Sequence, residues 1–197
     1  MRSGNNRHHQ LMKRLRKFLI SLFIFIGLSA LWYWADKKDY FNSEYRDLTA
    51  SQKRTFESQD GDDGEKLMQR YRHYFFDSQY AFPRQKVTKV KLFRNIPMIS
   101  ALTSKTLKTE YLDSFINFCN DTTNFHWGES SWQLYESKYY CRLYNAGGKV
   151  AGKIYFCIDD CGMTSSRPLS PAMKFGGLSP KGLNFIQQLF SDKTKWE

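Results

Sequence analysis

The chain has 197 residues, which is enough for one domain of ordinary size and an appendage. Its formal net charge of +11, taken alone, would favour a nucleic-acid partner. The first 17 residues supply six of the positive charges, however, so the rest of the chain carries +5. This residual charge suits anionic lipid headgroups or an acidic partner protein equally well, and nucleic-acid binding is therefore not predicted.

An uncharged apolar segment covers residues 18–35 and reads FLISLFIFIGLSALWYWA. As a helix, these 18 residues would extend roughly 27 Å, close to the hydrocarbon thickness of a bilayer. Phe18 begins the segment, and Trp32 and Trp34 lie near its end, where amphipathic rings prefer the level of the lipid headgroups. We predict a transmembrane anchor over 18–35.

Two other kinds of segment have a similar apolar sequence, a cleaved signal peptide and a buried core helix. A cleaved signal peptide also begins with basic residues, but its apolar region is usually shorter and ends in a small-x-small cleavage site. Ala30 and Ala35 each have a large residue two positions earlier, Leu28 and Tyr33, so neither is a good site. A buried core helix fits poorly with a segment that is apolar on every side and follows a basic chain end.

The charges that flank the apolar segment are unequal. Residues 1–17 contain six basic and no acidic residues, whereas 36–47 contains four acidic and three basic residues. The positive-inside rule then places residues 1–17 in the cytoplasm and everything after the segment outside it. We predict a single-pass protein of the cell inner membrane with a periplasmic C-terminal domain.

The remainder of the chain divides into a polar juxtamembrane stalk over 36–64 and an extracytoplasmic α+β domain over 65–197. Helical spacing of apolar residues and period-two alternation predict the elements of the stalk and of the domain. They are helices over 43–57, 65–79 and 106–119, a last helix that Ser179 caps, strands over 86–93, 132–135, 138–144 and 150–158, and a turn at 146–148. We expect an antiparallel sheet, with a hairpin around 138–158, packed by three or four helices.

All four cysteines lie in the predicted outer domain: Cys119, Cys141, Cys157 and Cys161. An even count on the oxidising side of a membrane predicts two disulfides. The short C-I-D-D-C loop favours Cys157–Cys161, which leaves Cys119–Cys141, although three pairings are possible. A zinc site is an alternative, but it would need further ligands, and only His126 lies close in the sequence. A thioredoxin-type redox pair would have two intervening residues in place of three.

The segment 147–154, G-G-K-V-A-G-K-I, matches the phosphate-loop pattern except at its last position, where Ile154 replaces Ser or Thr. A phosphate loop also precedes a helix, whereas the aromatic and β-branched residues that follow Lys153 predict a strand. We therefore predict a hairpin turn with solvent-facing lysines and no nucleotide site.

Candidate catalytic groups are few. His126 and Glu129 are close enough in sequence for acid–base work if a cleft brings them together, and Asp159 is a third candidate, more simply explained as part of a turn. A histidine beside aromatic residues is more often a packed or surface residue. Asn120-Asp121-Thr122 is a glycosylation sequon, which matters only in a eukaryotic host. No cofactor or metal is predicted.

Aromatic residues make up 17% of the chain, and most are explained by core packing and the membrane interface. The strand over 138–144 has rings on both faces, so it is either a core strand buried on two sides or a strand with one exposed binding face. Exposed tyrosine and tryptophan next to arginine are typical of protein interfaces. The interface candidates are Trp132, Tyr135, Tyr140, Arg142, Tyr144 and Tyr155.

These patterns predict a membrane-anchored, non-enzymatic interaction protein of the cell envelope. An accessory subunit of a secretion or conjugation complex and a periplasmic immunity protein both fit this description. The alternative is an anchored periplasmic hydrolase that acts on cell wall or glycan. A cleft that gathers His126 with two carboxylates would favour the hydrolase.

Overall fold

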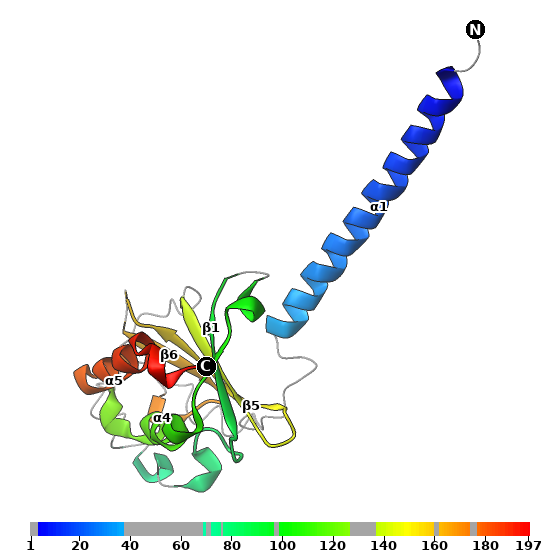
Figure 1. Cartoon of the computed structure of the whole chain (residues 1–197). Helices are drawn as coiled ribbons and strands as arrows, with labels where there is room; N and C mark the ends of the chain where they lie inside the picture. Colours follow the sequence, from blue (N-terminus) through cyan, green and yellow to red (C-terminus); the bar gives the residue numbers. More distant parts are fainter. Residues whose placement is uncertain are drawn as a thin grey trace. The chain divides into compact units, whose positions relative to one another are not determined.

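The structure is a computed structural model, which describes residues 4–37, 69, 72–75, 77–96, 99–126, 137–159, 162–173 and 177–197. The chain forms two units, 1–41 and 42–197. The first contains the helix α1 (Gly4–Lys37), and the second contains an antiparallel sheet with helices packed on it (Figure 1). The predicted α+β class with an N-terminal apolar helix is confirmed.

Helix α1 contains no proline, and its interior is rich in leucine, isoleucine and phenylalanine. A stretch that is long and apolar enough to cross a membrane covers Gln10–Trp32. The apolar side chains of this stretch, including Phe18, are exposed, as are Trp32 and Trp34 at its end, which argues against a core helix. A single-pass anchor and a signal sequence both fit these properties.

In the second unit, the described strands form a seven-stranded sheet in the order β2-β1-β4-β5-β6-β7-β3, in which each strand pairs antiparallel with its neighbours. The strands are β1 (Lys89–Arg94), β2 (Lys105–Thr106), β3 (Phe125–His126), β4 (Tyr139–Tyr144), β5 (Val150–Cys157), β6 (Met163–Arg167) and β7 (Gly177–Leu178). The predicted hairpin is β4–β5. Its turn places Gly148 at a φ of 74°, a region that glycine adopts without strain, and the Gly148 N–H donates to the Asn145 carbonyl.

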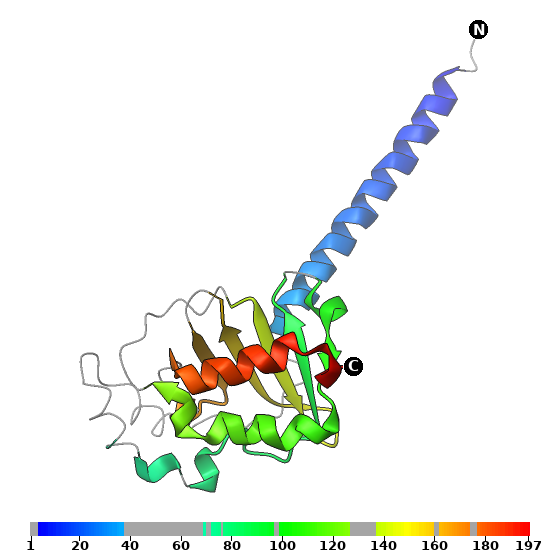
Figure 2. The ribbon, with the colours of Figure 1, turned by 60° about the vertical axis from the view of Figure 1, so that its left-hand side comes forward.

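Two helices, α4 (Leu112–Asn120) and α5 (Pro180–Ser191), lie side by side across one face of the sheet (Figure 2). The hydroxyl of Ser179 accepts from the Gly182 N–H at 3.1 Å, and Pro180 occupies the first turn, so the predicted start of α5 is confirmed. Beneath the helices lies an apolar core built from both layers. Its fully buried side chains include Val90, Phe115, Leu143, Ile154, Phe156 and Ile186.

The helix predicted over 106–119 begins later than expected, because the chain first contributes to the sheet. The Thr106 N–H donates to the Glu197 carbonyl at 2.7 Å, and the Glu197 N–H donates back at 2.8 Å. Leu107 and Trp196 form an adjoining bridge. The Trp196 indole N–H donates to the Leu189 carbonyl at 2.8 Å and so ties this tail to α5. Backbone pairing with the tail therefore outweighs the helical pattern of the first residues.

The side chain of Asn120 joins the end of α4 to the segment before the sheet. Its carbonyl accepts from the Phe82 N–H at 2.8 Å, and its amide donates to the carbonyls of Phe82 at 2.6 Å and Ile116 at 2.9 Å. The side chain that the sequon would modify is thus occupied by three hydrogen bonds within the fold, which argues against glycosylation at Asn120.

Several predicted elements lie wholly or largely outside the described residues. They are the stalk over 36–64, the helix over 43–57 and the strand over 132–135. Of the helix predicted over 65–79, the structure describes residues 69 and 72–75 as helical. Asp77 then caps a separate 3-10 helix, η1 (Ser78–Tyr80), so the α-helix ends earlier than predicted.

Gly182 provides a test of how α5 packs. A Cβ atom at this position would meet the Asn124 carbonyl oxygen well inside van der Waals contact. We expect Gly182→Ala to lower the free energy of unfolding by about 2 kcal/mol or more, because backbone must move to accommodate the methyl group. Chemical denaturation of the full chain measures the change. The control is Gly147→Ala at the hairpin turn, where space is available; equal effects of the two substitutions would contradict the packing.

Candidate functional site

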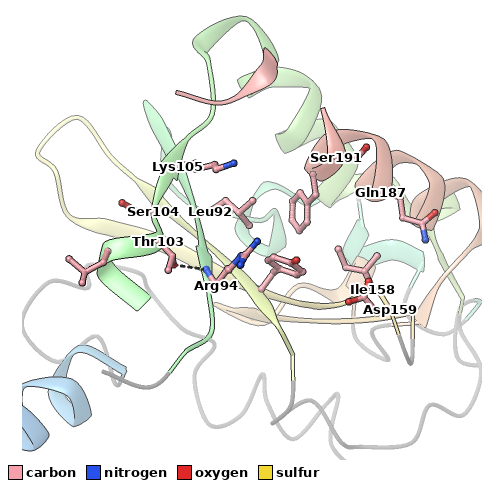
Figure 3. Close-up of a pocket in the computed structure, with 12 residues that line it drawn as sticks. Leu92, Arg94, Thr103, Ser104, Lys105, Ile158, Asp159, Gln187 and Ser191 are labelled. Carbon is pink, nitrogen blue, oxygen red and sulfur yellow. Dashed lines mark hydrogen bonds between the residues drawn. The ribbon is translucent and has the colours of Figure 1, made fainter. Parts of the chain in front are cut away.

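A pocket of about 630 Å³ lies between the β1–β2 edge of the sheet and the C-terminal half of α5 (Figure 3). The strand register determines which side chains line it. Lys105 pairs with Leu92 across β2 and β1, and Arg94 pairs with Tyr139 across β1 and β4. Directly paired residues share a face of a sheet, so all four side chains lie on the face that carries the helices.

The floor and inner wall of the pocket are apolar. Its lining includes Leu92 of β1, Tyr139 of β4, Ile158 directly after β5, and Phe190 of α5. The rings of Tyr139 and Phe190 meet edge to face with their centroids 5.7 Å apart, a favoured aromatic geometry that fixes both rings. This arrangement offers a ligand a preformed apolar surface.

Arg94 and Lys105 add positive charge to one side of the pocket. Both side chains are exposed, and among the described residues no carboxylate forms a salt bridge with either of them. Asp159 is the acidic residue that lines the pocket, and its carboxylate already binds the Lys138 ammonium at 3.1 Å. The pocket therefore combines an apolar floor with two cations that are available to an anionic group.

The outer rim is formed by the 3-10 helix η2 (Ser100–Thr103). Within it the Thr103 hydroxyl accepts from the Arg94 N–H at 3.0 Å and donates to the Ser100 carbonyl at 2.7 Å, which fastens the rim to β1. Leu102 in η2 is 86% exposed, and Ile99 before it is 46% exposed. Exposed aliphatic side chains on a fastened rim extend the apolar surface beyond the pocket.

The predicted interface residues occupy a different surface. Tyr140 and Arg142 are only 4% and 8% exposed, so the expectation of an exposed binding face is wrong at these two positions. Tyr140 stacks on Phe93 with ring centroids 4.9 Å apart, and the Arg142 guanidinium lies 5.3 Å from the Phe93 ring centroid. Strand β4 is thus buried on both faces, as a core strand, which is one of the two alternatives that the sequence allowed.

The other predicted interface residues give no contiguous exposed surface among the described residues. Tyr144 and Tyr155 are half-buried. Trp132 and Tyr135 lie outside the described residues.

The segment that resembles a phosphate loop is part of the hairpin. Gly147 and Gly148 form the turn, and Gly152 and Ile154 lie within β5. Lys149 is exposed, but the prediction that Lys153 faces solvent is wrong, since Lys153 is 2% exposed. Its ammonium lies 4.8 Å from the Tyr140 ring centroid and 5.1 Å from that of Tyr155, so cation–π contacts stabilise the buried charge.

The cysteines differ from the predicted pairing. Cys119 and Cys141 are buried and free, so the predicted Cys119–Cys141 disulfide is wrong. Both thiols lie in the apolar core, Cys119 on α4 and Cys141 on β4, and desolvation raises the pKa of each above its ordinary value. Cys157 is disulfide-bonded. Cys161 lies outside the described residues, so its pairing with Cys157 stays a prediction.

The candidate catalytic groups are not brought together among the described residues. His126 is exposed on β3, where it pairs with Gly177, and does not line the pocket that contains Asp159. Glu129 lies outside the described residues. Within the described ranges no three His, Cys, Asp or Glu residues are grouped as metal ligands would be.

Sequence reasoning missed the pocket, because its two cations lie eleven positions apart and meet only through the β1–β2 register. The signal that could have indicated them is the pair of apolar residues, Ile99 and Leu102, in the loop between them. Such residues are exposed if the loop crosses an edge of the sheet.

The buried thiols lead to a test of the cysteine assignment. We expect Cys119 and Cys141 to resist a thiol-reactive disulfide reagent at about pH 8 in the folded full chain, because burial and the raised pKa suppress the reactive thiolate. Unfolding in guanidinium without reductant should release both. Labelling followed by peptide mass spectrometry identifies the sites. Rapid labelling of the folded chain, or no labelling after unfolding, would show the assignment to be wrong.

Comparison with known proteins found no match to a family model, to a curated protein sequence or to a solved structure. The fold and the pocket are therefore the basis on which a function can be inferred for this chain.

Proposed function

We propose that the chain is a membrane-anchored binding protein whose α+β domain holds a partner protein of the cell envelope. The observation that supports this proposal is the composition of the pocket beside β1 and β2. Arg94 and Lys105, which form no salt bridge with a carboxylate among the described residues, lie there next to an apolar floor. Mixed apolar and charged surfaces of this kind are typical of recognition sites.

The anchor in this proposal is the apolar stretch of α1, inserted in the inner membrane with the basic residues 1–17 in the cytoplasm. The excess of basic residues before the stretch supports this orientation. It places the α+β domain in the periplasm, where an accessory subunit of a secretion or conjugation complex, or an immunity protein, would meet its partner. The membrane anchor would restrict the search for that partner to the membrane surface.

The orientation is tested with a reporter enzyme that becomes active only outside the cytoplasm. Fused after Glu197, it should be active, because a single span with its basic end inside leaves the rest of the chain outside. A matched fusion carries a reporter that is active only in the cytoplasm, and it should be silent. The opposite pattern of activity would refute the proposed topology.

The binding role is tested by site-specific photocrosslinking in intact cells. A photoreactive amino acid in place of Leu102, on the rim of the pocket, should yield a defined adduct with one envelope protein. The same amino acid in place of Ala146, which is exposed at the hairpin turn, is the control. No adduct at Leu102, or identical adducts at both positions, would contradict a partner site at the pocket.

A further inference from the structure

We propose that the pocket recognises an acidic–apolar peptide segment of the partner. A carboxylate of that segment binds between Arg94 and Lys105, and a neighbouring large apolar side chain rests on Leu92, Tyr139 and Phe190. This inference rests on the proposed function and specifies the chemistry of the partner that the same site accepts.

The register brings the two cations close enough to share one anionic group. Lys105 lies opposite Leu92, and Arg94 follows Leu92 by two residues on the same face. Such diagonal neighbours in a sheet lie about 7–8 Å apart, with their Cβ atoms somewhat closer, and long side chains can span this distance. Figure 3 shows the Lys105 side chain extending from β2 towards α5, on the same side of the pocket as Arg94.

The carboxylate on the opposite wall of the pocket is paired with a lysine. This carboxylate, that of Asp159, is bound by Lys138 at 3.1 Å. Among the described residues that line the pocket, Arg94 and Lys105 are then the charged side chains that no salt bridge offsets. Charge complementarity therefore selects an acidic ligand in preference to a basic one.

The apolar contribution comes from the same set of neighbours. Arg94 pairs directly with Tyr139, and the Tyr139 ring contacts Phe190, so a carboxylate on the cations lies immediately beside the aromatic wall. A bulky side chain next to the acidic residue would cover this wall and displace water from it. Exposed Leu102 can continue the contact with the next residue of the segment.

Polar groups of α5 favour a peptide over other amphiphilic anions. Gln187 and Ser191 line the pocket on the side opposite Arg94. The Gln187 amide provides two N–H donors and an acceptor oxygen, and the Ser191 hydroxyl, which donates to the Gln188 carbonyl at 3.4 Å, provides an acceptor. An extended peptide backbone presents alternating donors and acceptors to such groups, whereas a lipid acyl chain presents none.

The test is selection of peptides on the full chain reconstituted in phosphatidylcholine nanodiscs, which carry no net lipid charge. The probe is a phage-displayed library of random heptapeptides. We expect the selected peptides to be enriched in Asp or Glu next to Leu, Ile or Phe, relative to selection on empty nanodiscs. No enrichment in acidic residues would overturn the inference.

Affinity measurements on the best selected peptide then locate the site. Arg94→Gln with Lys105→Gln should weaken binding about tenfold or more, since each lost charge-assisted hydrogen bond is worth more than a neutral one. Replacing the acidic residue of the peptide with its amide should have a similar effect. The control is Lys149→Gln in the hairpin turn, where a lysine is also exposed, and equal weakening by the control would refute the site.

Both substituted side chains are exposed, so the variant chains should remain folded, which circular dichroism checks.

Raising the salt concentration from about 0.01 M to about 0.1 M shortens the screening length from about 30 Å to about 10 Å and should lower the affinity for the peptide. Leu102→Ser should also weaken peptide binding. Tight binding that changes neither with the salt concentration nor with Leu102→Ser would overturn the two-part recognition.

Two results separate this inference from the proposed function. A specific photocrosslink at Leu102 without acidic enrichment among selected peptides would retain the partner site and refute its chemistry. Binding of the full chain to phosphatidylglycerol vesicles that is abolished by Arg94→Gln with Lys105→Gln, again without acidic enrichment, would identify a lipid surface as the occupant and refute the peptide.

Discussion

The double burial of β4 is the constraint on which the α+β domain depends. Its alternate residues Cys141 and Leu143 enter the core beneath the helices, while Tyr140 and Arg142 are buried on the other face. A slip of one residue in the register would move every side chain of such a strand to the opposite face. The pairing of β4 with β1 is therefore fixed from Tyr139 to Tyr144, and that with β5 is regular from Tyr139 to Leu143 before the register shifts at Tyr144. The rest of the sheet is built outward from these pairings.

The pocket is a consequence of this fixed register at the margin of the sheet. Because β1 is held against β4, Arg94 stands beside Tyr139, and the short pairing of β1 with β2 adds Lys105. Helix α5 supplies the facing wall through Phe190, whose ring also contacts Phe156 and Trp196 in the core. The apolar surface of the pocket is thus continuous with the core and held rigid by it, which limits the ordering cost of binding.

Local signals in the sequence predicted the parts of the fold that local physics determines. Gly148 requires a positive φ, so the hairpin was predictable. Ser179 and Pro180 mark the start of α5 by chemistry that acts within one turn.

The disulfide prediction made from the cysteine pattern failed for the opposite reason. An even number of thiols says nothing about which ones the core will surround, and the burial of Cys119 and Cys141 arises from the packing of α4 on β4. The prediction that Lys153 faces solvent failed for the same reason. The two aromatic rings that contact its ammonium belong to different strands, Tyr140 to β4 and Tyr155 to β5.

The pairing of Thr106 with Glu197 also determines how this sheet meets other chains. Edge strands with unsatisfied N–H and C=O groups are templates for sheet extension and aggregation. Here backbone hydrogen bonds at 2.7 and 2.8 Å occupy the outer side of β2, and the Trp196 side chain is bonded to α5. Growth of the sheet from the β2 edge would first require this tail to detach. The tail therefore protects the β2 edge against polymerisation while the neighbouring side chains stay open to a ligand.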